Sequence, residues 1–297
     1  MVTVLITGVT GFLGSALARE LCKTHRIIGL KRHASDLFRL ADIANHIMLY
    51  DADQVSLETL FQEFSIDFVI HTATDYGKHG AVTKVLDANV QYPLSLLSLS
   101  IANGVTAFIN TDTFYTPNYG ALQYYSLSKR QFLEWAKQLS DDVQVINLKT
   151  GVLFGPMDNH DKFTPSMIRR LLASESEIDL TPGDQKRNFI YVEEAARIYR
   201  LLLERISNIP PGFNEFNVGS SETYSIRDFI EQLHRLTQSR SCLKFGALPY
   251  RANEIMAPDA DISMLQRLGW KPKVKLEEAL IRTIDYEKNA CEFTTMT

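Results

Sequence analysis

The sequence lacks the features of a membrane-spanning, secreted or nucleic-acid-binding protein. Its 297 residues hold no apolar run near the roughly 20 residues that a membrane helix needs, so we expect no membrane partner. The opening residues, MVTVLIT, contain no basic leader and predict a strand, not a signal peptide. The net charge is −4 and no block of like charge occurs, which argues against a nucleic-acid partner.

Cysteine is also scarce. Cys22, Cys242 and Cys291 are scattered, show no metal-ligand spacing and form an odd set that cannot pair completely. They predict reduced thiols, no metal site and a cytoplasmic location. What the chain does have is 45% hydrophobic and 22% charged residues, which is ordinary for a soluble globular enzyme large enough to bury a full core.

Apolar runs rich in β-branched residues alternate with longer helix-like stretches through the first half of the chain. This alternation predicts an α/β fold, a doubly wound parallel sheet of the Rossmann type, with ligands at the carboxyl ends of its strands. Strands are predicted at 2–7, 26–30, 47–50, 68–71, 107–110 and 143–148, and helices at 15–23, 82–103 and 127–139.

After residue 150, proline and glycine separate shorter elements. We expect a dinucleotide-binding domain over 1–150 and a smaller C-terminal α/β substrate-binding domain over 151–185 and 221–297. Residues 186–220 are expected to return to the first domain, with 188–192 and 216–218 joining its sheet. Amphipathic helices are predicted at 166–173, 192–204, 225–237 and 276–288.

A glycine-rich string, GVTGFLG, follows the first predicted strand and opens the first predicted helix. Gly8 would permit a tight turn, Gly11 would let the backbone approach a phosphate, and Gly14 would let helix and strand pack closely. The helix N-terminus then offers free N–H groups to a pyrophosphate. The string therefore predicts a dinucleotide seat made of Gly8, Thr10, Gly11, Phe12, Leu13 and Gly14.

The end of the second predicted strand bears on the choice of cofactor. An acidic residue there would bind a ribose 2′-hydroxyl, whereas basic residues accommodate a 2′-phosphate. Lys31 and Arg32 occupy this position, and no carboxylate precedes Asp36. The pattern favours NADPH over NADH. The alternative is that Lys31 and Arg32 are solvated surface cations with no part in cofactor binding.

Tyr125 and Lys129 stand four residues apart, one above the other on a helix. A tyrosine normally loses its proton at a pKa of about 10. An ammonium one turn away stabilises the phenolate, so we expect the pKa of Tyr125 to be lowered toward neutrality for acid–base work. Such a pair also occurs by chance on exposed helix faces.

Three further strings accompany these motifs: VIHTAT at 69–74, FINTDTFY at 108–115 and RNFIYVEE at 187–194. With the glycine loop, they resemble the extended short-chain dehydrogenase/reductase family in its sugar-nucleotide epimerase and reductase branch, and the resemblance covers nearly the whole chain. The strings DYGKH at 75–79, DKFT at 161–164 and RANE at 251–254 are similar to the 4-ketoreductase group of CDP-paratose and CDP-abequose synthases, which make sugars for lipopolysaccharide O-antigen.

The resemblance implies a role for each matching position. Thr111 would bind the substrate oxygen, Tyr125 would be the acid/base and Lys129 its electrostatic partner. Further cofactor-binding positions would be Lys31, Arg32, Asp51, Ala52, Thr72, Ala73, Thr74 and Asn89, and substrate-binding positions Asp75, Tyr76, Asp112, Thr113, Arg187 and Arg251. A nucleotide-sugar substrate and a homodimer are implied in the same way.

Thr113 stands where dehydratases of the family carry a glutamate, so dehydration is disfavoured. Epimerisation beside a carbonyl needs an acid and a base on opposite ring faces. The candidates are His71, His79, Asp75 and Tyr76, although His71 is interpreted as a packed side chain. The sequence favours NADPH-dependent reduction of a nucleotide-linked 4-keto sugar. The alternatives are an NAD-dependent 4-epimerase and a non-catalytic dinucleotide-sensing regulator.

Overall fold

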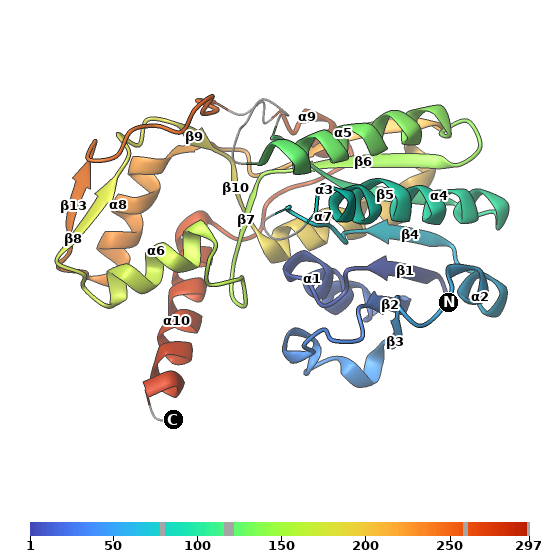
Figure 1. Ribbon diagram of the computed structural model, residues 1–297, viewed down its shortest axis with the longest axis horizontal. Coiled ribbons are helices and arrows are strands. Elements are labelled where there is room, and N and C mark those ends of the chain that lie inside the picture. Colours follow the sequence, from blue (N-terminus) through green and yellow to red (C-terminus); the bar gives the residue numbers. More distant parts are fainter. Residues whose placement is uncertain (78–80, 116–121, 258–260, 296–297) are drawn as a thin grey trace.

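The computed structural model describes residues 1–77, 81–115, 122–257 and 261–295, with the backbone alone for 291–295. Lys78 and His79, two residues of the DYGKH string, lie outside the described residues, as does the side chain of Cys291. The other two cysteines are free thiols. A large lobe and a small lobe lie side by side, with the C-terminal helix below the small lobe (Figure 1).

The large lobe is built on a seven-stranded parallel sheet in the order β11-β6-β5-β4-β1-β2-β3. Its central strands carry buried apolar residues on both faces, as expected of a sheet covered by helices on both sides. They are β1 (Thr3–Thr7), β2 (Arg26–Lys31), β3 (Met48–Asp51), β4 (Phe68–His71), β5 (Ala107–Thr113), β6 (Gln144–Thr150) and β11 (Phe213–Val218).

Helices cover both faces of this sheet, which confirms the predicted doubly wound fold (Figure 1). One face packs on α1 (Phe12–Leu21) and α7 (Val192–Glu204). The other packs on α2 (Leu57–Glu63), α4 (Tyr92–Ala102) and α5 (Gln123–Gln138). Between α3 (Val82–Leu86) and α4 the chain forms one π-helical turn, and short 3₁₀ turns occur at Phe38–Leu40, Ala44–His46 and Ile206–Asn208.

The small lobe has its own apolar core, centred on Phe154, Phe189 and Phe229. Phe189 and Phe229 stack with ring centroids 3.7 Å apart. The elements of this lobe are α6 (Phe163–Leu172), α8 (Ile226–Thr237), α10 (Leu276–Thr295) and the parallel pair of β8 (Glu177–Leu180) and β13 (Cys242–Phe245). The strand pairs β7 (Val152–Phe154) with β10 (Phe189–Tyr191) and β9 (Lys186–Arg187) with β12 (Tyr224–Ser225) adjoin it, and α9 (Ser263–Arg267) lies near β11.

Two expectations differ from the structure. Residues 216–218 do join the large sheet within β11, but the segment at 188–192 does not, because β10 pairs with β7 in a separate two-stranded sheet. The predicted helix at 82–103 is interrupted by the π-helical turn at Asp87–Gln91. Strands β7, β8 and β13 were not predicted. The domain boundaries at 150, 185 and 220 stay a prediction.

Candidate active site

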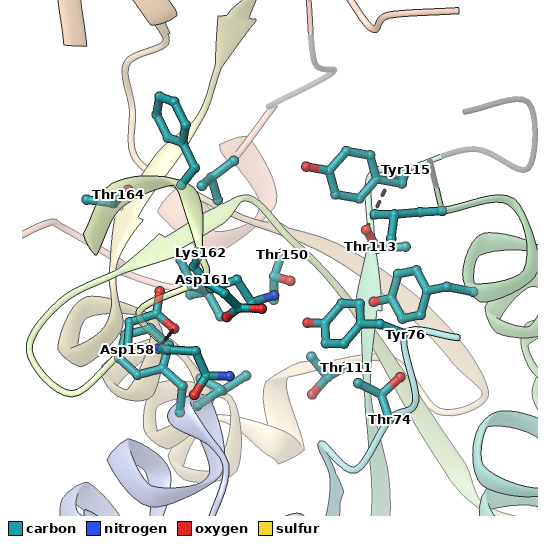
Figure 2. Close-up of a pocket in the computed structure, with 18 of the residues that line it drawn as sticks. Thr74, Tyr76, Thr111, Thr113, Tyr115, Thr150, Asp158, Asp161, Lys162 and Thr164 are labelled. Atoms are coloured by element: carbon teal, nitrogen blue, oxygen red, sulfur yellow. Dashed lines mark hydrogen bonds between the residues drawn. The ribbon is translucent and has the colours of Figure 1, made fainter. Parts of the chain in front are cut away.

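A cavity of about 1780 Å³ lies between the two lobes, at the carboxyl ends of β1, β2, β4, β5 and β6. Figure 2 shows part of it, with Thr74, Tyr76, Thr111 and Thr113 on the side of the large sheet. Asp158, Asp161 and Lys162 face them from the segment that leads into α6. The cavity is therefore placed where a doubly wound sheet binds its ligands.

The glycine loop forms one end of the cavity, and its backbone geometry leaves no room for side chains. Gly8 has φ +67°, and a Cβ there would lie 2.8 Å from the backbone nitrogen of Ala73. A Cβ on Gly14 would lie 2.2 Å from the carbonyl oxygen of Gly8. The loop then opens α1, whose N-cap is Gly11. This cradle fits a dinucleotide pyrophosphate, which needs close backbone approach and a helix N-terminus.

Thr7, the last residue of β1 before this loop, forms hydrogen bonds to the end of β4 and the residues after it. The sequence analysis missed this role. Its hydroxyl contacts His71 Nδ1 at 2.8 Å and accepts the backbone N–H groups of Thr72 and Ala73 at 3.2 and 3.3 Å. The Thr72 hydroxyl in turn donates a hydrogen bond to the Thr7 carbonyl at 2.7 Å. His71 is fully buried, and burial lowers its pKa well below the usual range. It is a packed side chain, as interpreted from the sequence.

The end of β2 carries a cluster of charges around Asp51. The Lys31 ammonium is hydrogen-bonded to one carboxylate oxygen, and His33 Nδ1 lies 2.7 Å from the other. Bonds from Lys31 first and His33 second hold the pKa of Asp51 below its usual range. Lys31, Arg32 and Ala52 line the cavity, as do Ser35 and Asp53. Asp51 does not; its carboxylate is directed to its two basic partners.

Tyr125, Lys129 and Thr111 all reach the cavity wall. Lys129 is fixed by a 2.9 Å bond from Nζ to the carbonyl oxygen of Thr111, so it joins α5 to the end of β5. The Thr111 hydroxyl lies 2.8 Å from the hydroxyl of Tyr199, a partner on α7 that sequence analysis missed. Thr113 lies close enough to the Tyr125 phenol to act against the effect of burial on its pKa. The predicted residues thus share one site.

The expected lowering of the pKa of Tyr125 is wrong. Only 6% of Tyr125 is exposed, and burial raises the pKa of its phenol well above 10, with Tyr76 and Asp112 acting in the same direction. Burial also lowers the pKa of Lys129 to about 8. Removing both groups from water disfavours their charged forms, and this outweighs the attraction that the four-residue spacing suggested. The phenol is therefore neutral at physiological pH.

Asn89 lies behind the residues that face the cavity, and its role in cofactor binding stays a prediction. It is 1% exposed and is not part of the cavity wall. Its side-chain oxygen accepts the Thr74 hydroxyl at 3.1 Å and the Asp75 backbone N–H at 2.8 Å, and its amide donates to Ser128 Oγ at 2.9 Å. Asn89 therefore ties the loop after β4 to α5, behind the residues that face the cavity. Gly11 is likewise outside the cavity wall.

The predicted substrate-binding residues all line the cavity: Asp75, Tyr76, Asp112, Thr113, Arg187 and Arg251. The Arg187 guanidinium is already engaged. It is hydrogen-bonded to the Glu254 carboxylate and donates to the Ile255 carbonyl at 2.6 Å. The other cofactor positions, Thr10, Phe12, Leu13, Thr72, Ala73 and Thr74, also line the cavity.

Arg39 links the glycine loop to the segment before α6, which nothing in the sequence pattern indicated. It is 9% exposed and donates to the carbonyls of Met157 and Thr10 at 2.8 and 3.3 Å, and to Asn159 Oδ1 at 2.7 Å. Asp158 beside it lines the cavity, and burial raises its pKa to about 6. A buried carboxylate poised near neutrality is a common feature of functional sites.

The described residues form neither a metal site nor a membrane-spanning helix. No group of three or more His, Cys, Asp or Glu side chains within them is placed to hold a metal ion. None of the helices in the same part of the chain combines the length and the apolar character needed to cross a membrane.

Comparisons with known proteins agree with this architecture. The model of the NAD dependent epimerase/dehydratase family matches residues 4–219. CDP-abequose synthase of Salmonella typhimurium is 32% identical over 94% of this chain and 97% of its own. UDP-glucuronate 4-epimerase of Thermodesulfobacterium geofontis is 24% identical over 97% of both.

Among solved structures, UDP-glucuronic acid 4-epimerase of Bacillus cereus superposes with a TM-score of 0.83 at 23% identity, covering 97% of this chain and 99% of that one. At this identity the likeness establishes the fold. The family match and the 32% identity to a CDP-abequose synthase go further and confirm the resemblance inferred from the motifs. The chain belongs to the NAD dependent epimerase/dehydratase family, in the extended short-chain dehydrogenase/reductase group.

Proposed function

We propose that the protein catalyses the NADPH-dependent reduction of the 4-keto group of a CDP-linked deoxy or dideoxy hexose, for O-antigen or related glycan synthesis. The observation that carries the proposal is the buried phenol of Tyr125, kept neutral beside Lys129 and Thr111 in one cavity. The 32% identity to a CDP-abequose synthase supports the choice of sugar. A cytoplasmic homodimer is part of the same proposal.

The neutral form of the Tyr125 phenol is the form that a reduction requires. A ketone that accepts a hydride becomes an alkoxide, which must gain a proton from a nearby acid. Burial raises the pKa of the Tyr125 phenol, so the phenol carries that proton at physiological pH.

The other residues have distinct roles. When bound, the reduced nicotinamide dinucleotide supplies the hydride. Tyr125 donates the proton to the developing alkoxide, and Thr111 donates a hydrogen bond to the same oxygen while its own hydroxyl accepts from Tyr199. Lys129, below Tyr125 on α5, places positive charge beside the proton donor as it loses its proton. Gly8 and Gly14 keep the backbone open for the pyrophosphate.

The choice of NADPH rests mainly on Arg32. It lines the cavity beside Ser35, whereas the Lys31 ammonium is bonded to Asp51. A guanidinium and a hydroxyl suit a 2′-phosphate. We expect the double variant K31A/R32A to weaken NADPH binding more than NADH binding. Equal losses for the two cofactors would contradict the choice.

The test is turnover by the purified protein of CDP-, dTDP-, GDP- and UDP-linked 4-keto-6-deoxy hexoses. NADPH absorbance is followed, and the product is identified by mass. We expect stoichiometric NADPH oxidation with the CDP-sugar and a product two hydrogens heavier. The variant Y125F should bind NADPH but lose turnover. No oxidation with any of the four sugars would refute the proposal.

A 4-epimerase is the second candidate, because one of the relatives is a UDP-glucuronate 4-epimerase and the matching solved structures include epimerases bound to NAD. An epimerase would convert its sugar to an isomer of equal mass without consuming NADPH. A dinucleotide-sensing regulator would bind partners equally well with Y125F.

A further inference from the structure

Lys162 and Tyr76 meet across the cavity, next to the proton donor. Lys162 Nζ lies 4.1 Å from the centroid of the Tyr76 ring. The Tyr76 ring stacks on the Tyr125 ring with centroids 4.8 Å apart and planes 28° from parallel. Figure 2 shows Lys162 on the side of the small lobe and Tyr76 on the opposite side. A cation–π contact and a ring stack therefore connect the small lobe to Tyr125.

The backbone of Lys162 is held firmly in the small lobe. Lys162 is the N-cap residue of α6, with its backbone N–H bonded to the Asn159 carbonyl at 2.9 Å and its carbonyl accepting from Ser166 at 3.0 Å. The next residue, Phe163, packs its ring 6.2 Å from that of Phe229 in the lobe's core. Arg39 fixes the preceding segment through Asn159. The ammonium thus extends into the cavity from a rigid base.

The loop that carries Tyr76 is also fixed, and it is fixed to the helix of Tyr125. The side-chain oxygen of Asn89 accepts the Asp75 backbone N–H, and its amide donates to the Asp75 carbonyl, both at 2.8 Å. The same amide also donates to Ser128 Oγ on α5. The Gly77 N–H closes the loop onto the Asp75 carboxylate at 2.8 Å. Tyr76 itself is 38% exposed, and its ring contacts Lys162 on one side and Tyr125 on the other.

We propose that Lys162 is a positioning residue for the reaction, acting through Tyr76 on Tyr125. The ammonium holds the Tyr76 ring against the Tyr125 ring, and this stack fixes the direction of the phenol toward the reacting oxygen. The inference rests on the proposed role of Tyr125 as proton donor. It gives a function to the DKFT string at 161–164, which the chemistry of the large lobe leaves unexplained.

The competing role for a lysine in this cavity is direct binding of the substrate's diphosphate. The two roles differ in kinetics. A group that only binds substrate changes KM and leaves kcat intact, whereas one that orients the proton donor lowers kcat and kcat/KM together. They also differ in their dependence on Tyr76, because a diphosphate contact does not need the ring.

The test is a double-mutant cycle with K162M and Y76L, read on kcat for the sugar that the wild-type protein turns over. We expect each single variant to lose about 3- to 30-fold in kcat, the range of one cation–π contact, and K162M to keep KM near the wild-type value. The double variant should lose little more than either single one. K162R and Y76F keep the cation and the ring, and should restore most of kcat.

K137M is the matched control, because Lys137 makes a similar contact, 5.6 Å from the Phe213 ring, away from the cavity. It should keep wild-type kcat.

The same cycle can be measured by thermal unfolding of the cofactor-free variants. K162M should lower Tm less in the Y76L background than in the wild-type background. Additive losses in kcat, or a rise in KM with kcat intact, would overturn the inference. If the wild-type protein epimerises its sugar without consuming NADPH, the proposed function fails, while the cycle still tests Lys162.

Discussion

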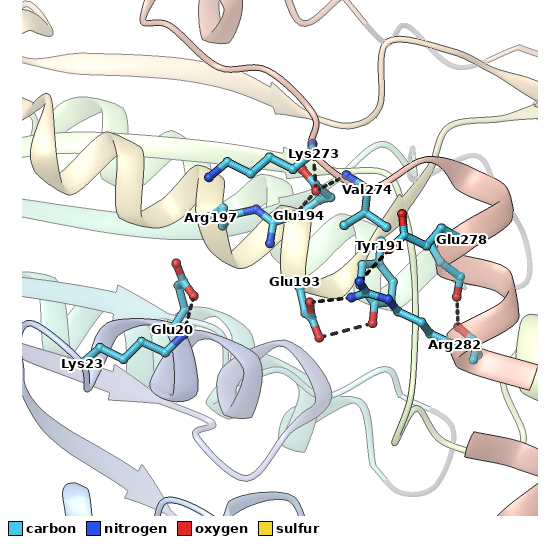
Figure 3. A network of polar contacts seen from close by, with 12 residues as sticks. Glu20, Lys23, Tyr191, Glu193, Glu194, Arg197, Lys273, Val274, Glu278 and Arg282 are labelled. Carbon is cyan, nitrogen blue, oxygen red and sulfur yellow. Dashed lines mark hydrogen bonds and ion pairs between the residues drawn. The ribbon is translucent and has the colours of Figure 1, made fainter. Parts of the chain in front are cut away.

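Glu194 holds the large lobe and the C-terminal helix together, and its removal should destabilise the whole protein. It lies on α7, which packs against α1, and its side chain is 4% exposed. One carboxylate oxygen accepts the backbone N–H groups of Lys273 and Val274 at 3.1 and 2.8 Å and is also bonded to Arg197 (Figure 3). Lys273 and Val274 lead into α10, so the carboxylate fixes the start of the small lobe's last helix.

The size of the effect follows from what each substitution leaves behind. In E194L the leucine side chain has a volume similar to that of glutamate, but the Arg197 guanidinium and two backbone N–H groups lose the carboxylate that accepted their hydrogen bonds. Breaking a buried pair in this way costs about 3–5 kcal/mol. E194Q keeps an acceptor oxygen and loses only the charge, for about 1–3 kcal/mol. The neighbouring Glu193 is 52% exposed and pairs with Arg282 at 3.5 Å, so E193Q should change stability by no more than about 0.5 kcal/mol.

The assay is equilibrium unfolding in urea for the wild-type protein and the three variants. The free energy of unfolding should be highest, and nearly equal, for the wild-type protein and E193Q. It should be lower for E194Q and lowest for E194L. A transition that splits into two for E194L would mean that α10 detaches before the large lobe unfolds, which also agrees with the assigned role. If E194L is as stable as E193Q, the carboxylate does not hold the two lobes together.

Three further outcomes are expected. G14A should abolish dinucleotide binding in calorimetry, because the added Cβ would lie 2.2 Å from the Gly8 carbonyl oxygen; unchanged affinity would mean that the loop can move aside. The pKa of Lys129 is lowered to about 8, so its ammonium is lost as pH rises through that value, and kcat/KM should fall there; a flat profile would show that its charge is not used. Y199F should lower kcat about fivefold by releasing the Thr111 hydroxyl, worth about 1 kcal/mol; unchanged kcat would show that the 2.8 Å contact does not orient Thr111.

The architecture of the large lobe was predictable because its signals are local. The central strands are buried on both faces, and β1, β3, β4 and β5 are each followed by a helix, so the alternation is visible in a short window of sequence. The π-helical turn at Asp87–Gln91 was not predictable, since the apolar stretch around it carries no sign of one extra residue per turn. That turn contains Asn89, whose bonds to the loop after β4 are long-range.

The site was predictable as a set of residues but not as a set of contacts. The motifs identified Tyr125, Lys129 and Thr111, and the structure brings all three to one cavity. The sign of the pKa shift at Tyr125 was missed because spacing reports on charge proximity alone, whereas burial depends on residues that only the fold brings around the phenol, such as Tyr76 and Asp112. Arg39 was missed because two of its three acceptors lie 118 and 120 residues away in sequence, and only the fold brings them near.

The polar residues behind the site explain how β5 presents Thr111 so rigidly. On one face of the sheet, Asn147 accepts from Asn110 at 2.7 Å and donates to Asp112 and Glu215 at 2.9 Å each, and Lys149 donates to Glu215 at 2.5 Å. Buried polar groups cost free energy unless they are bonded, and apolar residues would pack there without that cost. The hydrogen bonds, however, fix the register of the strand ends in a way that interchangeable aliphatic contacts do not. The network therefore gives the carboxyl end of β5 a single orientation, which the Thr111 contacts to Lys129 and Tyr199 require.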